Sequence, residues 1–262
     1  MRKSLSRIYL GIILVFMYLP IFTLIIFSFN ESKNMAVWSG FSLHWYERLF
    51  SDPVIGQAVW VTISVALLSA VAATLIGTLA AVGINNFRRR TRSAVLNITY
   101  VPMINADIVT GISLLLLFIF ISIPRGYVTM LLAHITFNIP YVILSVLPKL
   151  TQMDPQTYEA ALDMGAPPAY AVRKVVLPQI MPGVFTGLLL AFTMSFDDFV
   201  ISFFTTQGLT QNLSIYIYSM ARVGINPTIN ALSAIMFAIV ISLLFVVNLR
   251  IMKKDKTADK RI

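Results

Sequence analysis

Three acidic residues lie within long apolar stretches of this 262-residue chain: Asp107, Asp197 and Asp198. An ionised side chain in the hydrocarbon core of a bilayer costs about 2.5–3.5 kcal/mol on insertion scales, so each one needs a reason. Carboxylates that line a path through a membrane select cations over anions. The three residues therefore predict a path for a positively charged cargo.

Asp107 and Asp197 are expected at similar depths in the membrane. Asp107 follows Arg92 by 15 residues, and Asp197 follows Pro182 by 15 residues. At 1.5 Å per residue, both carboxylates lie on the order of 22 Å from the same membrane face. Asp197 and Asp198 point about 100° apart on a continuous helix, so at most one of them faces a central path squarely.

Two phenylalanines flank the acidic pair, Phe196 and Phe199. Their rings could attract an ammonium group in a cation–π contact worth about 2 kcal/mol when desolvated, although packing against lipid is the more common role. For Asp107 the alternative is a local cap in a helix broken after Pro102 and Asn105. For Asp197 and Asp198 the alternative is that their carboxylates pair with a neighbouring subunit.

A second set of residues lies in the polar interval 154–178, between two apolar stretches. The Asp-Pro pair at 154–155 is typical of a helix start, and Gly165 can take the left-handed conformation that ends a short helix. The Ala-Pro-Pro run at 166–168 then forces a turn. We expect a second short helix that Pro178 stops, and hence two short helices outside the bilayer, suited to contact with another subunit.

The spacing in this interval resembles the EAA loop of ABC-importer permease subunits. The matching positions are Glu159, Ala160, Ala161, Gly165, Leu177 and Pro178, with Val175 where the family has Ile. The resemblance implies that these residues, with Asp163 and Arg173, couple a membrane subunit to an ATPase. An amphipathic connector with a glycine turn is the alternative.

Further motifs resemble the polyamine branch of the same family. They are FSLHWYERL at 41–49, PMINADIV at 102–109, SFDDFVISFF at 195–204 and GINPTINAL at 224–232. The resemblance implies the type I ABC importer (MetI-like) fold, and a permease that moves spermidine or putrescine inward by alternating access. It places Asp107, Asp197 and Asp198 on the polyamine route. The implied partners are a second, related permease chain, two ATPase subunits and an external polyamine-binding protein.

Neither catalysis nor a bound cofactor is expected of this chain. It has no GxxxxGK[ST] phosphate loop, so ATP and Mg²⁺ must bind to a partner. It has no cysteine, and its two histidines, His44 and His134, are too few for a His-rich metal site. His134, in the stretch before Pro140, is expected to satisfy backbone groups freed by a proline kink.

Six apolar stretches of a length that can span a bilayer would position these residues. They are 8–29, 59–84, 94–121, 128–147, 183–204 and 230–251. Hydrophobic residues make up 58% of the chain and charged residues 12%, against about 25% charged in a soluble domain. The sequence thus predicts an all-α integral membrane protein, residues 1–262 forming a single transmembrane domain.

The basic residues predict its orientation. Sixteen of the 20 Lys and Arg residues lie in one set of alternate segments, and the remaining four are Lys33, Arg48, Arg125 and Arg222. Because basic residues collect on the cytoplasmic side, both termini and the interval 154–178 are expected in the cytoplasm of a bacterial cell, with the spans in its plasma membrane. The net charge of +9 thus reflects topology and contact with anionic lipid, not nucleic-acid binding.

Three other functions fit parts of the pattern. One is an ABC permease for another small solute, although three acids within the spans, and no basic residue there except Arg250 at the cytoplasmic end of the last stretch, disfavour an anion. A second is an ion-coupled secondary carrier that uses Asp107 and Asp197 as an ion relay, which leaves the EAA-like spacing without a role. The third is a structural or assembly subunit that transports nothing.

Overall fold

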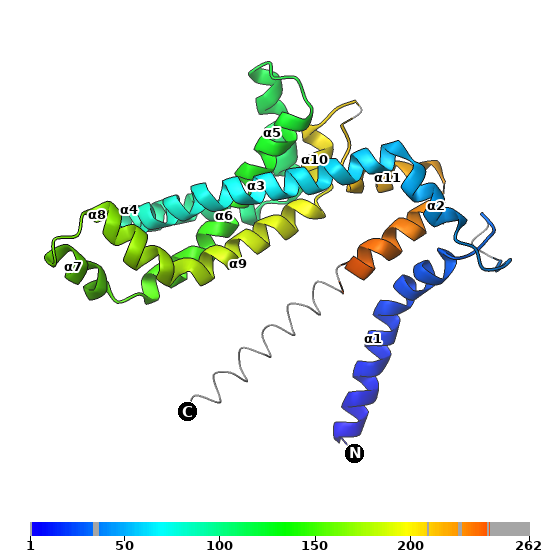
Figure 1. Ribbon diagram of the computed structural model, residues 1–262, viewed down its shortest axis with the longest axis horizontal. Coiled ribbons are helices and arrows are strands. Elements are labelled where there is room, and N and C mark those ends of the chain that lie inside the picture. Colours follow the sequence, from blue (N-terminus) through cyan, green and yellow to red (C-terminus); the bar gives the residue numbers. More distant parts are fainter. Residues whose placement is uncertain (1, 34–36, 209, 225–226, 240, 242–262) are drawn as a thin grey trace. The chain divides into compact units, whose positions relative to one another are not determined.

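The computed structural model describes residues 2–33, 37–208, 210–224, 227–239 and 241 (Figure 1). The named elements within these ranges are all helices, and the extended structure there is limited to one antiparallel bridge between Asn30 and Phe41. The predicted all-α fold is confirmed. The chain falls into two compact units, Met1–Gly56 with Ile217–Ile262, and Gln57–Tyr216.

The first unit contains α1 (Arg2–Phe27), α2 (His44–Ser51) and an apolar helix at Pro227–Ile239. From Tyr9 to Phe27, α1 is long and apolar enough to cross a membrane, and none of the side chains in that window is buried. A helix that is apolar and uncovered all round suits a lipid surrounding.

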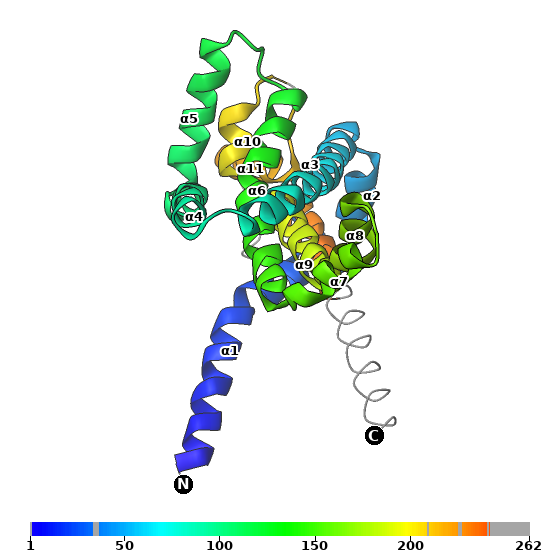
Figure 2. The ribbon, with the colours of Figure 1, turned by 90° about the vertical axis from the view of Figure 1, so that its left-hand side faces the viewer.

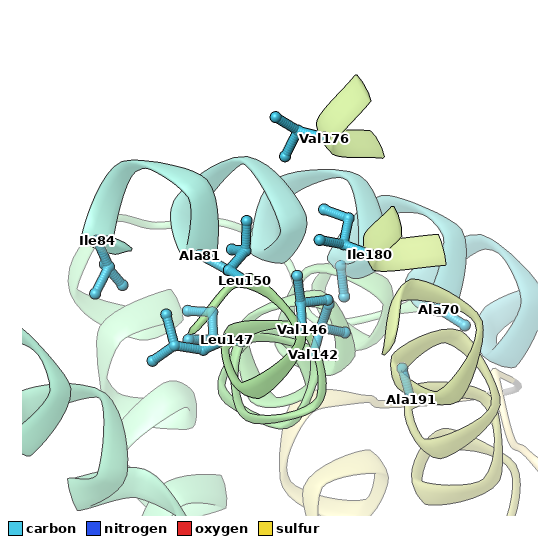
Figure 3. Close-up of a cluster of buried hydrophobic side chains, with 12 residues drawn as sticks. Ala70, Ala81, Ile84, Val142, Val146, Leu147, Leu150, Val176, Ile180 and Ala191 are labelled. Carbon is cyan, nitrogen blue, oxygen red and sulfur yellow. The ribbon is translucent and has the colours of Figure 1, made fainter. Parts of the chain in front are cut away.

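The core of the second unit is formed by α3 (Pro53–Asn85, which begins in the first unit), α6 (Tyr127–Gln152) and α9 (Leu177–Phe196). Small and branched side chains from the three helices form one buried cluster (Figure 3). Its small members are Ala70, Ala73, Ala81 and Ala191, each 0% exposed. Small residues let helix backbones approach closely, which is a principal source of helix association in lipid.

Two of the expected spans are broken, and both breaks fall at the acidic residues. The stretch 94–121 is divided into α4 (Arg89–Ile104) and α5 (Asp107–Phe120), which are bent by 102°. The stretch 183–204 is divided into α9 and α10 (Val200–Thr205). The short helices α5 and α10 pack against each other, and α10 also packs against α6 (Figure 2).

Each break has a local cause. Pro102 lies in the last turn of α4, where it lacks an N–H, and Asn105 and Ala106 take extended backbone angles. At the second break, the Asp198 carboxylate accepts hydrogen bonds from the N–H groups of Ile201 and Ser202. A side chain that takes up backbone donors in this way competes with continuation of the preceding helix.

The interval 154–178 forms α7 (Pro155–Asp163), α8 (Pro168–Ala171) and a π-helical turn (Val172–Val176) that leads directly into α9. The expectation that Pro178 stops the second short helix is wrong. In the π turn the Leu177 N–H donates to the Val172 carbonyl, five residues back. This wider turn displaces the carbonyls that a proline ring would strike in an α-helix, so the helix passes through Pro178.

Among the residues that the structure describes, four helices are long and apolar enough to cross a membrane, or five if the bent pair α4–α5 counts as one span. The helix at Pro227–Ile239 covers the start of the expected stretch 230–251, of which residues 240 and 242–251 lie outside the described residues. The count of six spans therefore stays a prediction. So does the assignment of the whole chain to a single transmembrane domain.

Candidate functional site

Asp198 is buried and fully engaged within the second unit. Its side chain is 8% exposed, and Oδ2 lies 3.4 Å from Nε2 of His134. Oδ1 accepts from the Ile201 N–H at 3.2 Å, and Oδ2 accepts from the Ser202 N–H at 2.8 Å. The carboxylate thus occupies the start of α10, where the helix dipole favours a negative charge.

His134 links this carboxylate to three other helices. Its Nε2 lies 2.9 Å from the Ser202 hydroxyl, and its Nδ1 hydrogen-bonds with the Ser195 hydroxyl of α9. Ser195 in turn lies 3.0 Å from the Ser69 hydroxyl of α3. The prediction that His134 satisfies backbone groups near the proline kink is therefore wrong, because both ring nitrogens contact side-chain hydroxyls.

Asn212 closes the cluster from the segment that precedes α11 (Leu213–Val223). Its Nδ2 donates to the Asp198 carbonyl at 2.8 Å and to the Ser202 hydroxyl at 2.9 Å. We call Asp198, His134, Ser195, Ser202, Ser69 and Asn212 the polar cluster. A buried network whose members are paired holds its elements in one arrangement.

Asp197 has the opposite environment, although it is the next residue. It is exposed, and it forms the C-cap of α9 with backbone angles of φ −101° and ψ 1°. Its carbonyl accepts from the Ser214 hydroxyl at 3.3 Å. Of the two adjacent residues, Asp197 is the exposed one.

Asp107 is the first residue of α5 and is also exposed. The N-cap of α5 is Ala106, so Asp107 does not cap the helix but lies within its first turn. Its carboxylate is close enough to Tyr141 of α6 for an electrostatic interaction. Gly111, one turn further along α5, packs against Val200 and Phe204 of α10, so the two acidic breaks belong to one packed arrangement.

The helix ends at the breaks favour a cation. The C-terminal ends of α4 and α9 lie beside Asp107 and Asp197, and a helix C-terminus carries about half a negative charge. The opposing N-terminal ends of α5 and α10 are offset by Asp107 and Asp198. The breaks therefore present carboxylates and carbonyl ends together, a combination that attracts ammonium groups.

The two flanking phenylalanines already have aromatic partners. Phe196 stacks on Phe192 with ring centroids 5.6 Å apart, and Phe199 lies 5.4 Å from Phe203. Both residues are half-buried. Their contact with cargo stays a prediction, in which each ring offers at most the face that its partner leaves open.

The interval 154–178 has the helix start and the helix end that its sequence predicts. The Asp154 carboxylate accepts from the Gln156 N–H at 3.0 Å, and Gly165 takes the left-handed conformation with φ +85°. The Ala166 N–H donates to the Ala161 carbonyl, and the Gly165 N–H donates to the Leu162 carbonyl. These two bonds form a Schellman motif, which ends α7 and turns the chain toward α8.

The predicted coupling residues lie mostly at the surface of this segment. Glu159, Ala160, Asp163, Gly165, Arg173, Leu177 and Pro178 are exposed, while Ala161 is half-buried. Glu159 also lines a cleft of about 460 Å³, together with Tyr158 of α7, Asn85 at the end of α3, Asn86 just beyond it and Met153 after α6. Tyr158 of α7 packs against the buried cluster, and the cleft opens beside it, between α7 and the ends of α3 and α6.

Several residues of the site were missed by the sequence analysis. Ser69, Ser195, Ser202 and Asn212 are small polar residues in or beside apolar stretches. Ser195 and Ser202 contact His134 directly, Ser69 joins the cluster through Ser195, and Asn212 joins it through Ser202. Asn85 and Tyr158 line the cleft but lie 73 residues apart in the chain. Within the described ranges, no group of three or more His, Cys, Asp or Glu residues lies close enough together to hold a metal ion.

Comparison with known sequences gives a family and several relatives. Residues 73–253 match the family described as binding-protein-dependent transport system inner membrane component. The spermidine/putrescine transport system permease protein PotC of Escherichia coli (strain K12) is 40% identical over 245 residues, which cover 94% of this chain and 92% of the relative. The putrescine transport system permease protein PotI of the same organism is 38% identical over 232 residues, covering 86% and 83%.

A solved structure has the same fold. A bacterial alginate ABC transporter, in complex with an alginate-pentasaccharide-bound periplasmic protein, matches with a TM-score of 0.70 over 94% of this chain and 92% of that chain. At 20% sequence identity, this likeness concerns the fold alone.

Proposed function

The chain belongs to the family of binding-protein-dependent transport system inner membrane components, and on that premise we propose that it is a permease subunit of an ATP-driven polyamine importer. Relatives at 38–40% identity over most of the chain carry spermidine or putrescine in their names. Polyamines are flexible polycations, so a path for them needs negative groups at intervals and no tight pocket.

The observation that carries the cargo proposal is the exposure of Asp107 and Asp197 at two helix breaks. Each carboxylate lies beside a helix C-terminus, and α5 and α10, which follow the two breaks, pack on each other. Broken spans at the binding level are a recurrent way to expose backbone carbonyls to a cation inside a membrane. We propose that both residues line the polyamine path, and that Phe196 and Phe199 contribute ring faces at its edge.

The partners follow from what the chain lacks and from its relatives. No phosphate loop occurs in the sequence, so two ATPase subunits must bind ATP and Mg²⁺ and hydrolyse the nucleotide. The alginate transporter with its periplasmic protein supports an external binding protein for this system too, here one that binds polyamines. A second, related permease completes the path. Both termini and the coupling segment lie in the cytoplasm.

We propose that the segment 154–178 transmits movement from the ATPase to the acidic breaks. The helix from Pro168 to Phe196 spans 29 residues, or ~43 Å at 1.5 Å per residue, and ends next to Asp197. Glu159, Ala160, Ala161, Asp163, Gly165 and Arg173 contact the ATPase, while Leu177 and Pro178 join the segment to α9. Movement of this segment therefore moves the break between α9 and α10, which supports alternating access.

Uptake of radiolabelled spermidine by the complete transporter in proteoliposomes tests this function. We expect uptake that requires both ATP and the external binding protein, and that unlabelled putrescine reduces while unlabelled amino acids and alginate oligosaccharides do not. Uptake of a different solute class with no spermidine uptake would leave the family assignment standing and overturn the cargo. Uptake by this chain without an ATPase would favour the ion-coupled carrier.

A further inference from the structure

We propose that Asp198, held by His134, is a positioning residue, and that the cargo meets Asp197 and not Asp198. The proposal rests on the proposed function insofar as it names a polyamine as the cargo. Its geometric part, that one acid of the pair is exposed and the other is anchored, does not depend on the cargo. It assigns separate roles to two residues that the sequence leaves equivalent.

Most of the acceptor capacity of Asp198 is already used. Two backbone N–H groups, from Ile201 and Ser202, donate to its two oxygens, and His134 Nε2 lies 3.4 Å from Oδ2. A carboxylate has about four lone-pair positions, so three donors leave little room for an ammonium group. A cargo would also have to reach a side chain that is 92% buried within the fold, since its exposed fraction is 8%.

The polar cluster fixes the backbone on both sides of Asp197. On the preceding side, Ser195 of α9 hydrogen-bonds with His134 of α6 and with Ser69 of α3. On the following side, Asn212 donates to the Asp198 carbonyl and to Ser202. Asp197 lies between these anchors, so its carboxylate is directed by contacts that it does not make itself.

The same contacts explain why the helix breaks at this place. The sequence between Met194 and Ile201 contains neither glycine nor proline. The Asp198 carboxylate instead takes the Ile201 and Ser202 N–H groups, whose partners in a continuous helix would be the carbonyls of Asp197 and Asp198. Those two carbonyls accept from Ser214 and Asn212. Loss of Asp198 or His134 therefore releases the break and changes where Asp197 points.

Cysteine accessibility tests this geometry directly, because the natural chain contains no cysteine. Asp197→Cys and Asp198→Cys are made separately in the complete transporter. Each is exposed in membrane vesicles to a membrane-impermeant cationic thiol reagent, and labelling is read on this chain alone through an affinity tag. We expect Asp198→Cys to react at least ~10-fold more slowly than Asp197→Cys, since the reaction needs access to water and to the reagent. Equal rates would overturn the proposal.

If Asp198→Cys does not fold, a second measurement tests whether Asp198 positions the residue at 197. Asp198→Asn or His134→Gln is combined with Asp197→Cys, and we expect the labelling rate of the Asp197→Cys thiol to change several-fold, roughly as for a shift from one helical face to another. Thr136→Val is the matched control, because Thr136 is on α6, is exposed and bonds only the Leu132 carbonyl in its own helix. If Asp198→Asn and Thr136→Val leave the same labelling rate, Asp198 positions nothing and the proposal fails.

Transport of two cargoes separates positioning from contact. Asp197→Asn should change the ratio of spermidine to putrescine uptake, because a trication and a dication lose different amounts of attraction. In the Asp197→Asn background, where residue 197 carries no charge to be positioned, adding Asp198→Asn should slow both cargoes by the same factor, with transporter abundance normalised by immunoblot. A further change of the ratio in that background would show that Asp198 contacts cargo and would overturn the proposal. If the wild type carries no polyamine, the proposed cargo fails, while the labelling results still decide the geometry.

Discussion

At the scale of single residues, the acids of this chain differ by their place relative to helix ends. Asp107 and Asp197 are exposed at breaks, while Asp198 is enclosed by the polar cluster. Asp197 lies at the C-terminus of α9, where the helix dipole does not offset its charge, and Asp107, in the first turn of α5, keeps an exposed carboxylate. Both charges are therefore available to an external cation. The Asp198 carboxylate instead interacts with the backbone N–H groups at the start of α10 and with His134.

The first prediction concerns Asp107→Asn. We expect spermidine uptake to fall by about tenfold or more, since one charge-assisted contact is worth ~1.5–3 kcal/mol and the substitution keeps the shape of the side chain. The measurement is the initial rate of ATP-dependent uptake at saturating binding protein. Glu47→Gln is the control, because it removes one negative charge from an exposed position on α2. Equal uptake by the two variants would remove Asp107 from the path.

At the scale of helices, the contact between α6 and α9 depends on glycine. A Cβ added at Gly183 would lie 2.7 Å from the Ser145 carbonyl oxygen and 2.8 Å from Lys149 Cγ. The lysine side chain can move, but the backbone carbonyl cannot move without displacing α6. The close approach of the two helices therefore requires glycine at this position.

The second prediction follows from that contact. Gly183→Ala should lower the stability of the purified transporter by about 1–3 kcal/mol, the usual cost of overpacking, seen as a lower midpoint of thermal unfolding. Gly83→Ala is the matched control in α3, where nothing lies within 4 Å of the added Cβ. There the greater helix propensity of alanine should leave stability unchanged or raise it by up to ~1 kcal/mol. Equal losses in both variants would refute the packing argument.

The third prediction concerns the turn that ends α7. Gly165 has φ +85°, and nothing lies within 4 Å of an added Cβ, so the objection to a side chain here is backbone strain alone. Gly165→Ala should cost roughly 1–2 kcal/mol at this turn and reduce the amount of ATPase that copurifies with the permease. Gly165→Asn should retain more ATPase, because asparagine tolerates the left-handed conformation. If both variants bind ATPase like the wild type, the turn does not shape the docking surface.

Local sequence signals predicted some elements well and others not at all. The helix start at Asp154 and the helix end at Gly165 depend on neighbours within a few residues, and both are confirmed. At the break after Asp197, the Asp198 carboxylate accepts two backbone hydrogen bonds and is buried beside His134, 64 residues earlier in the chain. No glycine or proline marks this break in the sequence. Pro178 was predicted to stop a helix, because a proline normally cannot continue one. The helix continues here through the π turn at Val172–Val176, and no residue in the sequence signals that turn.

At the scale of the whole molecule, one continuous helix joins the segment 154–178 to the polar cluster. The helix that begins at Pro168, after α7, ends at Phe196, beside Asp197 and the polar cluster. Between these ends it packs along α6, the most buried of the candidate membrane spans. A helix that is continuous between the two sites couples movement at one end to movement at the other, as ATP-driven alternating access requires.

The central claim is that this chain carries a polycation past exposed carboxylates when an ATPase drives it. The most direct measurement compares ATP-dependent spermidine uptake by wild type and Asp197→Asn in proteoliposomes, each normalised to the ATPase that copurifies. We predict uptake by the wild type and a loss of about tenfold or more in Asp197→Asn, with ATPase binding unchanged, as expected for one charge-assisted contact. Full spermidine uptake by Asp197→Asn, or none by an assembled wild-type transporter, would contradict the account.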